Sequence, residues 1–455
     1  MQAKEMVSQL VARARVAQEE YEACNQQEVD RVVKVIARTV FNHAEELARL
    51  AVEETGMGRV EDKIKKNKNK ARIIWNNLRD KKSVGIIKRD EERGIIEIAK
   101  PVGVVGAVTP CTNPIVIPMC NAMFALKGRN AVIFSPHPRA QRCLQKLLDM
   151  WWEELELLGV PTNLIQVLPD CSIDMAQELM RQVDVVMVTG GAGVVKAAYS
   201  SGKPALGVGA GNTVCIIDED VNLKTAVTKI VISKTFDYGI ICSSEQSVLV
   251  PEDLFDAAVQ EFCAQGAYYL TGEREKEALL RVMFKDGVIN RAIVGQTAQK
   301  IGAMAGLDIP ADRRLILVPG DGIGPEYLLC REKMSPVLTI YTYKSFSEAV
   351  QMTLDILRVE GRGHTVSIHS NNPAHIEELG LKAEACRILV NQVCSTNSGG
   401  SFENGLTPTT SQACGSWGGN SVSGNVDYKD LLNITRIAYP IPNPVIPSDE
   451  ELWGD

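Results

Sequence analysis

A candidate nucleophile is the first feature of this sequence that could do chemistry. The segment DYGIICSSEQSVLV, residues 237–250, places Cys242 after an apolar Gly-Ile-Ile run and before a polar turn that leads into a strand-like Ser-Val-Leu-Val. A thiolate at the entrance of a cleft can attack a carbonyl carbon and hold the product as a thioester. A packed thiol is the alternative, because free cysteines usually behave as small buried hydrophobic residues. The segment alone does not decide between these interpretations.

Polar and glycine-rich turns at the ends of apolar runs are the second such feature. Parallel sheets bind ligands at the carboxyl ends of their strands, and N–H groups at a following helix N-terminus suit a phosphate. One such turn is weak evidence, but several turns along one edge favour a dinucleotide site. The turn residues that we expect along this cofactor are Thr109, Pro110, Ser135, His137, Arg139, Thr189, Gly190, Gly191, Gly193 and Gly209.

An alternation of strand-like and helical segments predicts the scaffold for these turns. The runs VGVVGAVTP, AVIFSP, LIQVLP and VDVVMVTGG are separated by helical patterns, and NTVCIIDED is expected as the fourth or fifth strand of the same series. Strands that alternate with helices of this length form a parallel sheet covered on both faces. We therefore predict an α/β fold with a Rossmann-type, dinucleotide-binding domain made of residues 1–82 and 101–222.

The rest of the chain predicts three further parts. Residues 223–425 repeat the α/β pattern and contain Cys242, so we expect a second, catalytic domain there. Residues 83–100 read as a hairpin that is joined by residues 426–440, and residues 441–455 read as an extended surface arm. The basic run KIKKNKNKAR is interpreted as the solvated face of a helix.

Composition argues against several classes of function. The 455 residues carry 49 basic and 56 acidic side chains, a net charge of −7 without the basic excess typical of nucleic-acid binding. No apolar run approaches the roughly 18 residues of a spanning helix, and no apolar signal segment is recognised, so we expect a cytoplasmic protein without a membrane partner. The twelve cysteines form no C-x-x-C pair. No His, Cys, Asp and Glu cluster has metal-ligand spacing, and we predict no metal.

Taken together, these segments resemble the aldehyde dehydrogenase superfamily and, within it, the CoA-acylating branch. The motifs that carry the resemblance are PVGVVGAVTPCTNP, SPHPRA, TGGAGVVKAAYSSGKPALGVGAGN, DYGIICSSEQSV, CREKMSPVL, EGRGHT and ACGSWGGNS. The likeness covers about residues 10–435 and is greatest to acylating succinate-semialdehyde dehydrogenases. It implies an aldehyde-dehydrogenase-like fold, a nicotinamide cofactor, CoA as co-substrate, and an oligomerisation hairpin that makes a homodimer or a dimer of dimers.

The resemblance also implies roles for single residues. Cys242 matches the nucleophile, and Asn113 matches the asparagine that holds the substrate oxygen together with the backbone N–H of Cys242. Glu332 matches the glutamate that holds the nicotinamide ribose. His364 matches a histidine of the acylating branch, with thiol deprotonation, CoA placement and a structural role left open. The residues expected around the substrate are Ile241, Ser243, Ser395 and Thr396.

A missing carboxylate favours the acylating reaction over the hydrolytic one. Similar hydrolytic enzymes have a glutamate before two glycines, at the place where this chain has GVGAGN, with Val208, Gly209 and Ala210 and no acid. General-base help is typically worth about 100- to 10,000-fold, so water would attack a thioester slowly here and a thiolate such as CoA would take the acyl group. A hydrolytic enzyme with its base elsewhere, and a non-catalytic dinucleotide-binding relative, are the alternatives.

Substrate and cofactor choice stay open. The likeness favours succinate semialdehyde, while acetaldehyde, propionaldehyde and sulfoacetaldehyde remain alternatives. The loop at residues 394–412 offers hydroxyl and amide groups but no Arg or Lys for a charged substrate. Arg139, with no acidic residue at the same strand end, favours NADP slightly over NAD.

Overall fold

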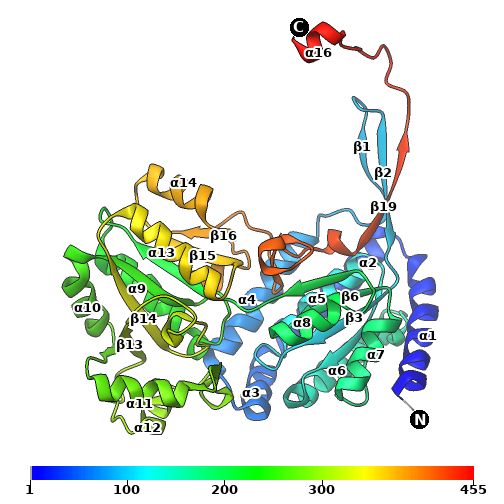
Figure 1. Ribbon diagram of the computed structural model, residues 1–455. Coiled ribbons are helices and arrows are strands. Elements are labelled where there is room, and N and C mark those ends of the chain that lie inside the picture. The colour runs from blue at the N-terminus through cyan, green and yellow to red at the C-terminus, as the bar shows by residue number, and fades with distance from the viewer. Residues whose placement is uncertain (1–2, 455) are drawn as a thin grey trace.

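Two parallel sheets, each in its own lobe, organise the chain (Figure 1). The structure is a computed structural model, and it describes residues 3–454. The first sheet has the order β5-β4-β3-β6-β7. Its strands are β3 (Val104–Thr109), β4 (Ala131–Pro136), β5 (Ile165–Val167), β6 (Val185–Thr189) and β7 (Ala205–Val208). All neighbouring pairs are parallel, which confirms the prediction of a Rossmann-type sheet.

Helices cover this sheet because its strands are apolar and buried on both faces. The N-terminal helices are α1 (Ala3–Glu22), α2 (Gln26–Asn42), α3 (Ala44–Thr55) and α4 (Val60–Leu78). The connecting helices are α5 (Val116–Lys127), α6 (Gln141–Leu157), α7 (Ile173–Gln182) and α8 (Ala192–Tyr199). Helix α3 is capped by Gly56, which takes the left-handed conformation with φ 68°. Helix α4 lies between the two lobes (Figure 1).

The second sheet has seven strands in the order β10-β13-β14-β9-β8-β15-β16. They are β8 (Thr213–Ile217), β9 (Glu245–Pro251), β10 (Ala267–Tyr269), β13 (Leu315–Pro319), β14 (Val337–Tyr343), β15 (Gly363–His369) and β16 (Ala385–Val390). The helices around it are α9 (Leu223–Thr235), α10 (Phe255–Ala264), α11 (Glu273–Met283), α12 (Ala298–Met304), α13 (Phe346–Val359) and α14 (Pro373–Lys382). The predicted second α/β unit is therefore present.

One strand lies in a different sheet from the one expected. The run NTVCIIDED was assigned to the first sheet, but β8 pairs with β9 and β15 of the second. The expected domain boundary at residue 222 therefore falls after a strand that already belongs to the second sheet. A fully apolar strand carries no local signal of which sheet it joins. The strand that completes the first sheet, β7, is only four residues long and was not expected.

A three-stranded antiparallel arm projects from the body of the molecule (Figure 1). It consists of β1 (Gly85–Asp90), β2 (Ile95–Pro101) and β19 (Leu432–Ala438), so the predicted hairpin and its third strand are both present. The tail beyond it, expected as an extended surface arm, is exposed and ends in the short helix α16 (Asp449–Trp453). Between residues 3 and 454, no helix is both long and apolar enough to cross a membrane.

Candidate active site

The candidate site forms where the carboxyl edge of the first sheet meets the amino edge of the second. Cys242 lies just before β9, and residues 209–212 connect the end of β7 to the start of β8. A side chain on Gly211 would place its Cβ 2.0 Å from the carbonyl oxygen of Cys242, so only glycine fits. The glycine-rich turn predicted to border the cofactor therefore packs directly on the candidate nucleophile.

The cysteine is carried by a turn in an unusual backbone conformation. Asp237 and Tyr238 have φ of 51° and 54°, and Gly239 follows with φ 69°. Left-handed conformations of non-glycine residues cost free energy and persist only where surrounding contacts hold them, often at functional sites. Here the carboxylate of Asp237 accepts from the backbone N–H of Arg59 at 2.8 Å, while its own N–H donates to Asp62 at 2.9 Å.

The thiol of Cys242 is disfavoured as a thiolate in its present surroundings. Burial and the nearby charge of Glu332 raise its pKa to about 12, while the positive charge of Arg387 acts in the opposite direction. The side chain is nevertheless partly exposed to solvent. A reaction through this sulfur therefore needs a change in its electrostatic surroundings or a proton acceptor.

Asn113 is held in a defined orientation by a lysine of α4. Lys66 Nζ donates to Asn113 Oδ1 at 2.5 Å and to Asp237 Oδ2 at 2.6 Å. Because an ammonium only donates, the side-chain oxygen of Asn113 is the bound atom and its Nδ2 amide is left to donate elsewhere. That is the arrangement required of a donor to a substrate oxygen.

Two buried lysines share one carboxylate in this region. Lys63 Nζ also lies 3.0 Å from Asp237 Oδ2, and both ammonium groups are almost fully enclosed. Burial would raise the pKa of Asp237, but Lys66 and Lys63 hold it at about 2. The expectation that the basic run at residues 63–72 forms a solvated face is therefore wrong for this face of α4. The counter-charge comes from a segment about 170 residues away, beyond any local pattern.

Glu332 lies beside the same turn. Its Oε1 accepts from the N–H of Gly211 at 3.3 Å, and its own N–H donates to Glu360 Oε2 at 2.8 Å. Burial, followed by repulsion from Glu360, raises the pKa of Glu332 to about 8. The structure thus brings Glu332 within reach of the electrostatic field at Cys242.

His364 is the second residue of the fully buried strand β15 and is not hydrogen-bonded to Cys242. Its Nδ1 lies 2.8 Å from Thr365 Oγ1, while its Nε2 is buried without a partner. Burial and the charge of Arg387 lower the pKa of His364 to about 3, so the imidazole is neutral. Arg387 donates to the His364 carbonyl at 3.0 Å, which places the same guanidinium beside the histidine and in the field of the thiol.

The structure brings only some of the residues expected around the substrate close to Cys242. Ser243 Oγ bonds Ser398 Oγ at 2.6 Å, so the predicted loop borders the residue next to Cys242. The backbone N–H of Ser395 donates to Ser233 at 2.9 Å, and its hydroxyl is buried without a partner. Thr396 instead bonds within its own loop. Ile241 packs with a small apolar cluster that includes Met57 and Ile240.

The expected cofactor turns follow one another along the first sheet. Thr109 ends β3 and Pro110 follows it, Ser135 is the last residue but one of β4, and Thr189 ends β6 ahead of Gly190. Added Cβ atoms at Gly191, Gly193 and Gly209 would meet nothing within 4 Å, so these backbones face open space that a ligand can approach. His137 accepts from the backbone N–H of Arg139 at 3.1 Å, and the Arg139 guanidinium donates to the Thr55 carbonyl at the end of α3. A phosphate-bearing cofactor fits this edge.

Sequence reasoning missed three charged residues of the site: Lys66, Asp237 and Arg387. Arg387 is buried, and it donates to Thr365 Oγ1 and to the carbonyl of Ala413 as well as to His364. An arginine inside an apolar strand pattern was the only local signal. No group of three or more His, Cys, Asp and Glu side chains within the described chain could hold a metal ion.

Comparison with known proteins identifies the relatives of this chain. The aldehyde dehydrogenase family matches residues 1–279. The acetylating succinate-semialdehyde dehydrogenase of Clostridium kluyveri is 46% identical over 98% of this chain and 99% of its own. A sulfoacetaldehyde dehydrogenase of an Acholeplasma species is 42% identical over 99% and 94%. An acetylating aldehyde dehydrogenase from Geobacillus thermoglucosidasius superposes with a TM-score of 0.94 at 40% identity, over 98% of both chains.

Proposed function

Because the chain belongs to the aldehyde dehydrogenase family, we propose that Cys242, Asn113 and Glu332 carry the reaction of its CoA-acylating branch. The enzyme is an NAD(P)-dependent, CoA-acylating aldehyde dehydrogenase. It interconverts aldehyde, CoA and NAD(P)+ with acyl-CoA and NAD(P)H. The assignment of roles to single residues is the part that experiment must test.

Cys242 is the nucleophile in this proposal. After loss of its proton, the sulfur attacks the aldehyde carbon and forms a tetrahedral thiohemiacetal. The oxyanion is stabilised by the Nδ2 amide of Asn113 and by the N–H of Cys242, and Lys66 fixes the amide by holding its oxygen. Loss of one oxyanion donor typically costs about 100- to 1000-fold in rate.

The nicotinamide cofactor supplies hydride transfer when it is bound. The open backbones of Gly191, Gly193 and Gly209 would border its phosphates and nicotinamide, and Glu332 would accept from its ribose. Thr109, Pro110 and Ser135 would lie along the same edge. The resulting acyl group stays on the sulfur of Cys242 until the CoA thiolate displaces it, which breaks the bond to the enzyme sulfur and forms the new thioester.

The observation that carries this proposal is the turn packed on Cys242. Gly211, within the turn at residues 207–212, packs on the backbone of Cys242, and this turn contains no carboxylate that could activate water. Glu332 is a carboxylate whose charge acts on the thiol of Cys242, but its Oε1 already accepts a hydrogen bond from the Gly211 N–H. Slow hydrolysis favours transfer to CoA, and exchange between two thioesters is close to balanced, so the reaction is reversible.

Succinate semialdehyde and succinyl-CoA are the proposed substrates, because the Clostridium kluyveri relative is named for that aldehyde. Sulfoacetaldehyde, acetaldehyde and propionaldehyde are the alternatives. We propose a preference for NADP, supported by Arg139 and by the absence of acidic residues from SPHPRA. His364 is proposed to act near the thiol or the CoA through its unpartnered Nε2.

We also propose that the protein is cytoplasmic and forms a homodimer or a dimer of dimers. The arm and the tail beyond it expose large apolar side chains, which a partner would cover. They are Ile437, Tyr439, Ile441, Val445, Ile446, Leu452 and Trp453.

A spectrophotometric assay at 340 nm tests the function. Succinyl-CoA and acetyl-CoA are each offered with NADPH and NADH to the wild type and to Cys242→Ala. Cofactor oxidation by the wild type alone supports the acylating reaction and identifies the preferred pair. Oxidation of an aldehyde at the same rate with and without CoA would instead mean a hydrolytic enzyme.

A further inference from the structure

Arg387 is a buried cation whose hydrogen bonds all go to uncharged groups. It lies in β16 and is only 4% exposed. Its guanidinium donates to the carbonyl of His364 at 3.0 Å, to Thr365 Oγ1 at 3.3 Å and to the carbonyl of Ala413. Its Nε is buried without a partner. A buried charge is costly unless an opposite charge compensates it, so a counter-ion is expected close by.

The ionisable groups that act on Arg387 within the described chain are thiols. They are Cys414, Cys386, Cys242 and Cys394. The side chains of Cys394 and Cys414 are buried, whereas those of Cys242 and Cys386 are partly exposed. A cation next to a thiol stabilises the thiolate. One of these sulfurs is therefore the group best placed to balance the guanidinium charge.

A short series of contacts joins Arg387 to Cys242. Arg387 bonds the carbonyl of Ala413, and the next residue is Cys414, whose thiolate form is favoured by the backbone N–H of Gly209. Gly211, two residues further along the same turn, packs against the backbone and Cβ of Cys242. The thiols of Cys414 and Cys242 thus border one glycine-rich turn, next to the segment that the guanidinium holds.

Charges of both signs surround Cys242. Glu332 and Cys414 oppose its ionisation, and Arg387 favours it. Cys394 and Lys70 of α4 also interact with this sulfur. Burial lowers the pKa of Lys70 to about 8, so that lysine loses its charge at alkaline pH, whereas an arginine remains protonated. Arg387 is therefore the cation near the thiol whose charge does not depend on pH.

We propose that the buried guanidinium of Arg387 stabilises the thiolate of Cys242, which makes Arg387 a positioning residue for the nucleophile. The inference rests on the proposed function and deepens it. A guanidinium has no acceptor site, so the thiol proton leaves to solvent, which reaches the partly exposed side chain of Cys242. Arg387 then lowers the free energy of the sulfur anion that remains. It makes no hydrogen bond to Cys242 in the described chain, so its charge acts through space.

The test measures alkylation of Cys242 by iodoacetamide between pH 7.5 and pH 10, without cofactor or substrate. Peptide mass spectrometry follows Cys242 in the wild type, in Arg387→Gln, which removes the charge, and in Arg387→Lys, which keeps it at the lower pH. Arg358→Gln is the matched control, because that arginine is exposed on α13 and pairs with Asp355. Labelling of the buried Cys215 in the same digest reports loss of the fold.

We expect Arg387→Gln to react about 3- to 10-fold more slowly than the wild type over the whole range. A pKa higher by one unit lowers the thiolate fraction tenfold, and the greater nucleophilicity of a more basic thiolate recovers part of the loss. Arg358→Gln should react at the wild-type rate.

The lysine variant separates charge from structure. Arg387→Lys should react within about twofold of the wild type at pH 7.5 and approach the rate of Arg387→Gln at pH 10. Burial lowers the pKa of a lysine, so the new ammonium loses its proton in this range, whereas the guanidinium of the wild type does not. A purely structural role would give a ratio to the wild type that does not change with pH.

An unchanged alkylation rate in folded Arg387→Gln would overturn the proposal, and so would a pH-independent rate ratio for Arg387→Lys. If Cys215 becomes labelled in Arg387→Gln, that variant has unfolded, and the pH dependence of Arg387→Lys decides alone. The proposed function fails separately. If the wild type makes no acyl-CoA from any aldehyde, or if Cys242→Ala is as active as the wild type, the acylating reaction itself is wrong.

Discussion

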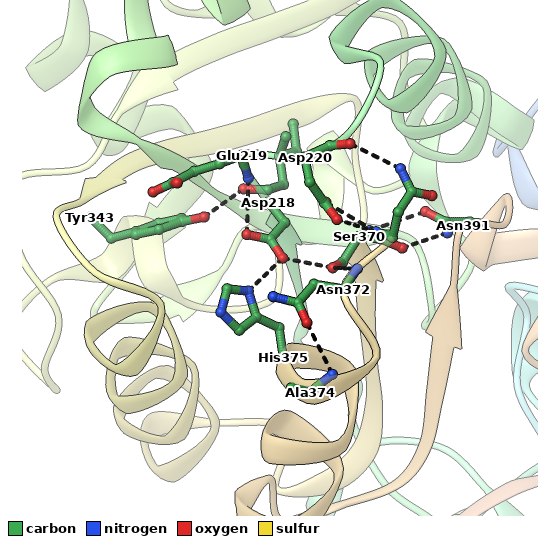
Figure 2. Close-up of polar contacts among 11 residues, drawn as sticks. Asp218, Glu219, Asp220, Tyr343, Ser370, Asn372, Ala374, His375 and Asn391 are labelled. Atoms are coloured by element: carbon green, nitrogen blue, oxygen red, sulfur yellow. Dashed lines mark hydrogen bonds and ion pairs between the residues drawn. The ribbon is translucent and has the colours of Figure 1, made fainter.

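The two edges of the seven-stranded sheet differ in how their polar groups are satisfied. At the carboxyl edge, Asp218 Oδ2 accepts from Ser370 Oγ at 2.6 Å and lies 2.8 Å from His375 Nδ1 (Figure 2). Asn391 bonds the backbone of Ser370 in both directions, at 2.7 and 3.1 Å. His375 also stacks on Phe346, with ring centroids 3.9 Å apart. Asp218, Ser370 and Asn391 are thus joined in one hydrogen-bonded network, beside which His369 Nε2, at the end of β15, is buried without a partner.

At the amino edge, which carries Cys242, several polar side-chain atoms lack hydrogen-bond partners. His364 Nε2, Arg387 Nε and the Ser395 hydroxyl are all buried there without partners. Native proteins satisfy most buried polar groups, so such exceptions point to a ligand or to a functional constraint. Ligands of α/β sheets generally bind at the carboxyl edge. That generalisation suits the first sheet and its proposed cofactor turns, whereas in the second sheet the proposed nucleophile lies at the opposite edge.

Asn113→Ala should have the largest effect on the reactive edge. We expect kcat to fall about 100- to 1000-fold with little change in the free energy of unfolding, because the variant removes one donor to the oxyanion. Steady-state kinetics with succinyl-CoA and NADPH checks this. A loss below tenfold in a folded variant would mean that Asn113 does not contact the oxyanion.

Lys66→Met should reduce kcat about 10- to 100-fold by releasing the side chain of Asn113 and leaving Asp237 with one lysine. The double variant Lys66→Met/Asn113→Ala decides the mechanism, since residues that act through one contact are not additive. Its activity should match that of Asn113→Ala alone. Additive losses would show that Lys66 acts independently.

Glu332→Gln should make the thiol more acidic. The charge of Glu332 contributes to the raised pKa of Cys242, so its removal lowers that pKa and increases the thiolate fraction below it. We expect cofactor-free alkylation of Cys242 by iodoacetamide at pH 9, where Glu332 with its pKa of about 8 is mostly ionised, to accelerate by up to about tenfold for each pKa unit recovered. Peptide mass spectrometry follows Cys242 specifically, and an unchanged rate would mean that Glu332 exerts no field on the sulfur.

His375→Ala should have the smallest effect on catalysis, because it alters the hydrogen-bonded network at the other edge. We expect the free energy of unfolding to fall by about 1–3 kcal/mol, through loss of a partner for buried Asp218, while kcat/KM stays within about twofold. Urea unfolding and the 340 nm assay measure the two quantities. A large fall in activity at unchanged stability would place the carboxyl edge in the reaction.

The sequence predicted the features that depend on residues close together along the chain. Cys242 and Glu332 lie in contiguous motifs, and apolar runs predicted most of the strands around them. The sheet that β8 joins, and the burial of Lys63 and Lys66, depend on partners far along the chain. A lysine-rich helix has the same local pattern whether it faces solvent or a buried Asp237, so only tertiary contacts separate these cases.

The ammonium of Lys66 joins a residue of each lobe, Asn113 after β3 and Asp237 before Cys242. This ammonium is therefore a single point of attachment between the two lobes. A movement that opens the two sheets to admit a cofactor must rotate about this contact or break it, since both partners are held by one nitrogen atom. The contact thereby fixes the segment that carries Asn113 against the turn that leads to Cys242.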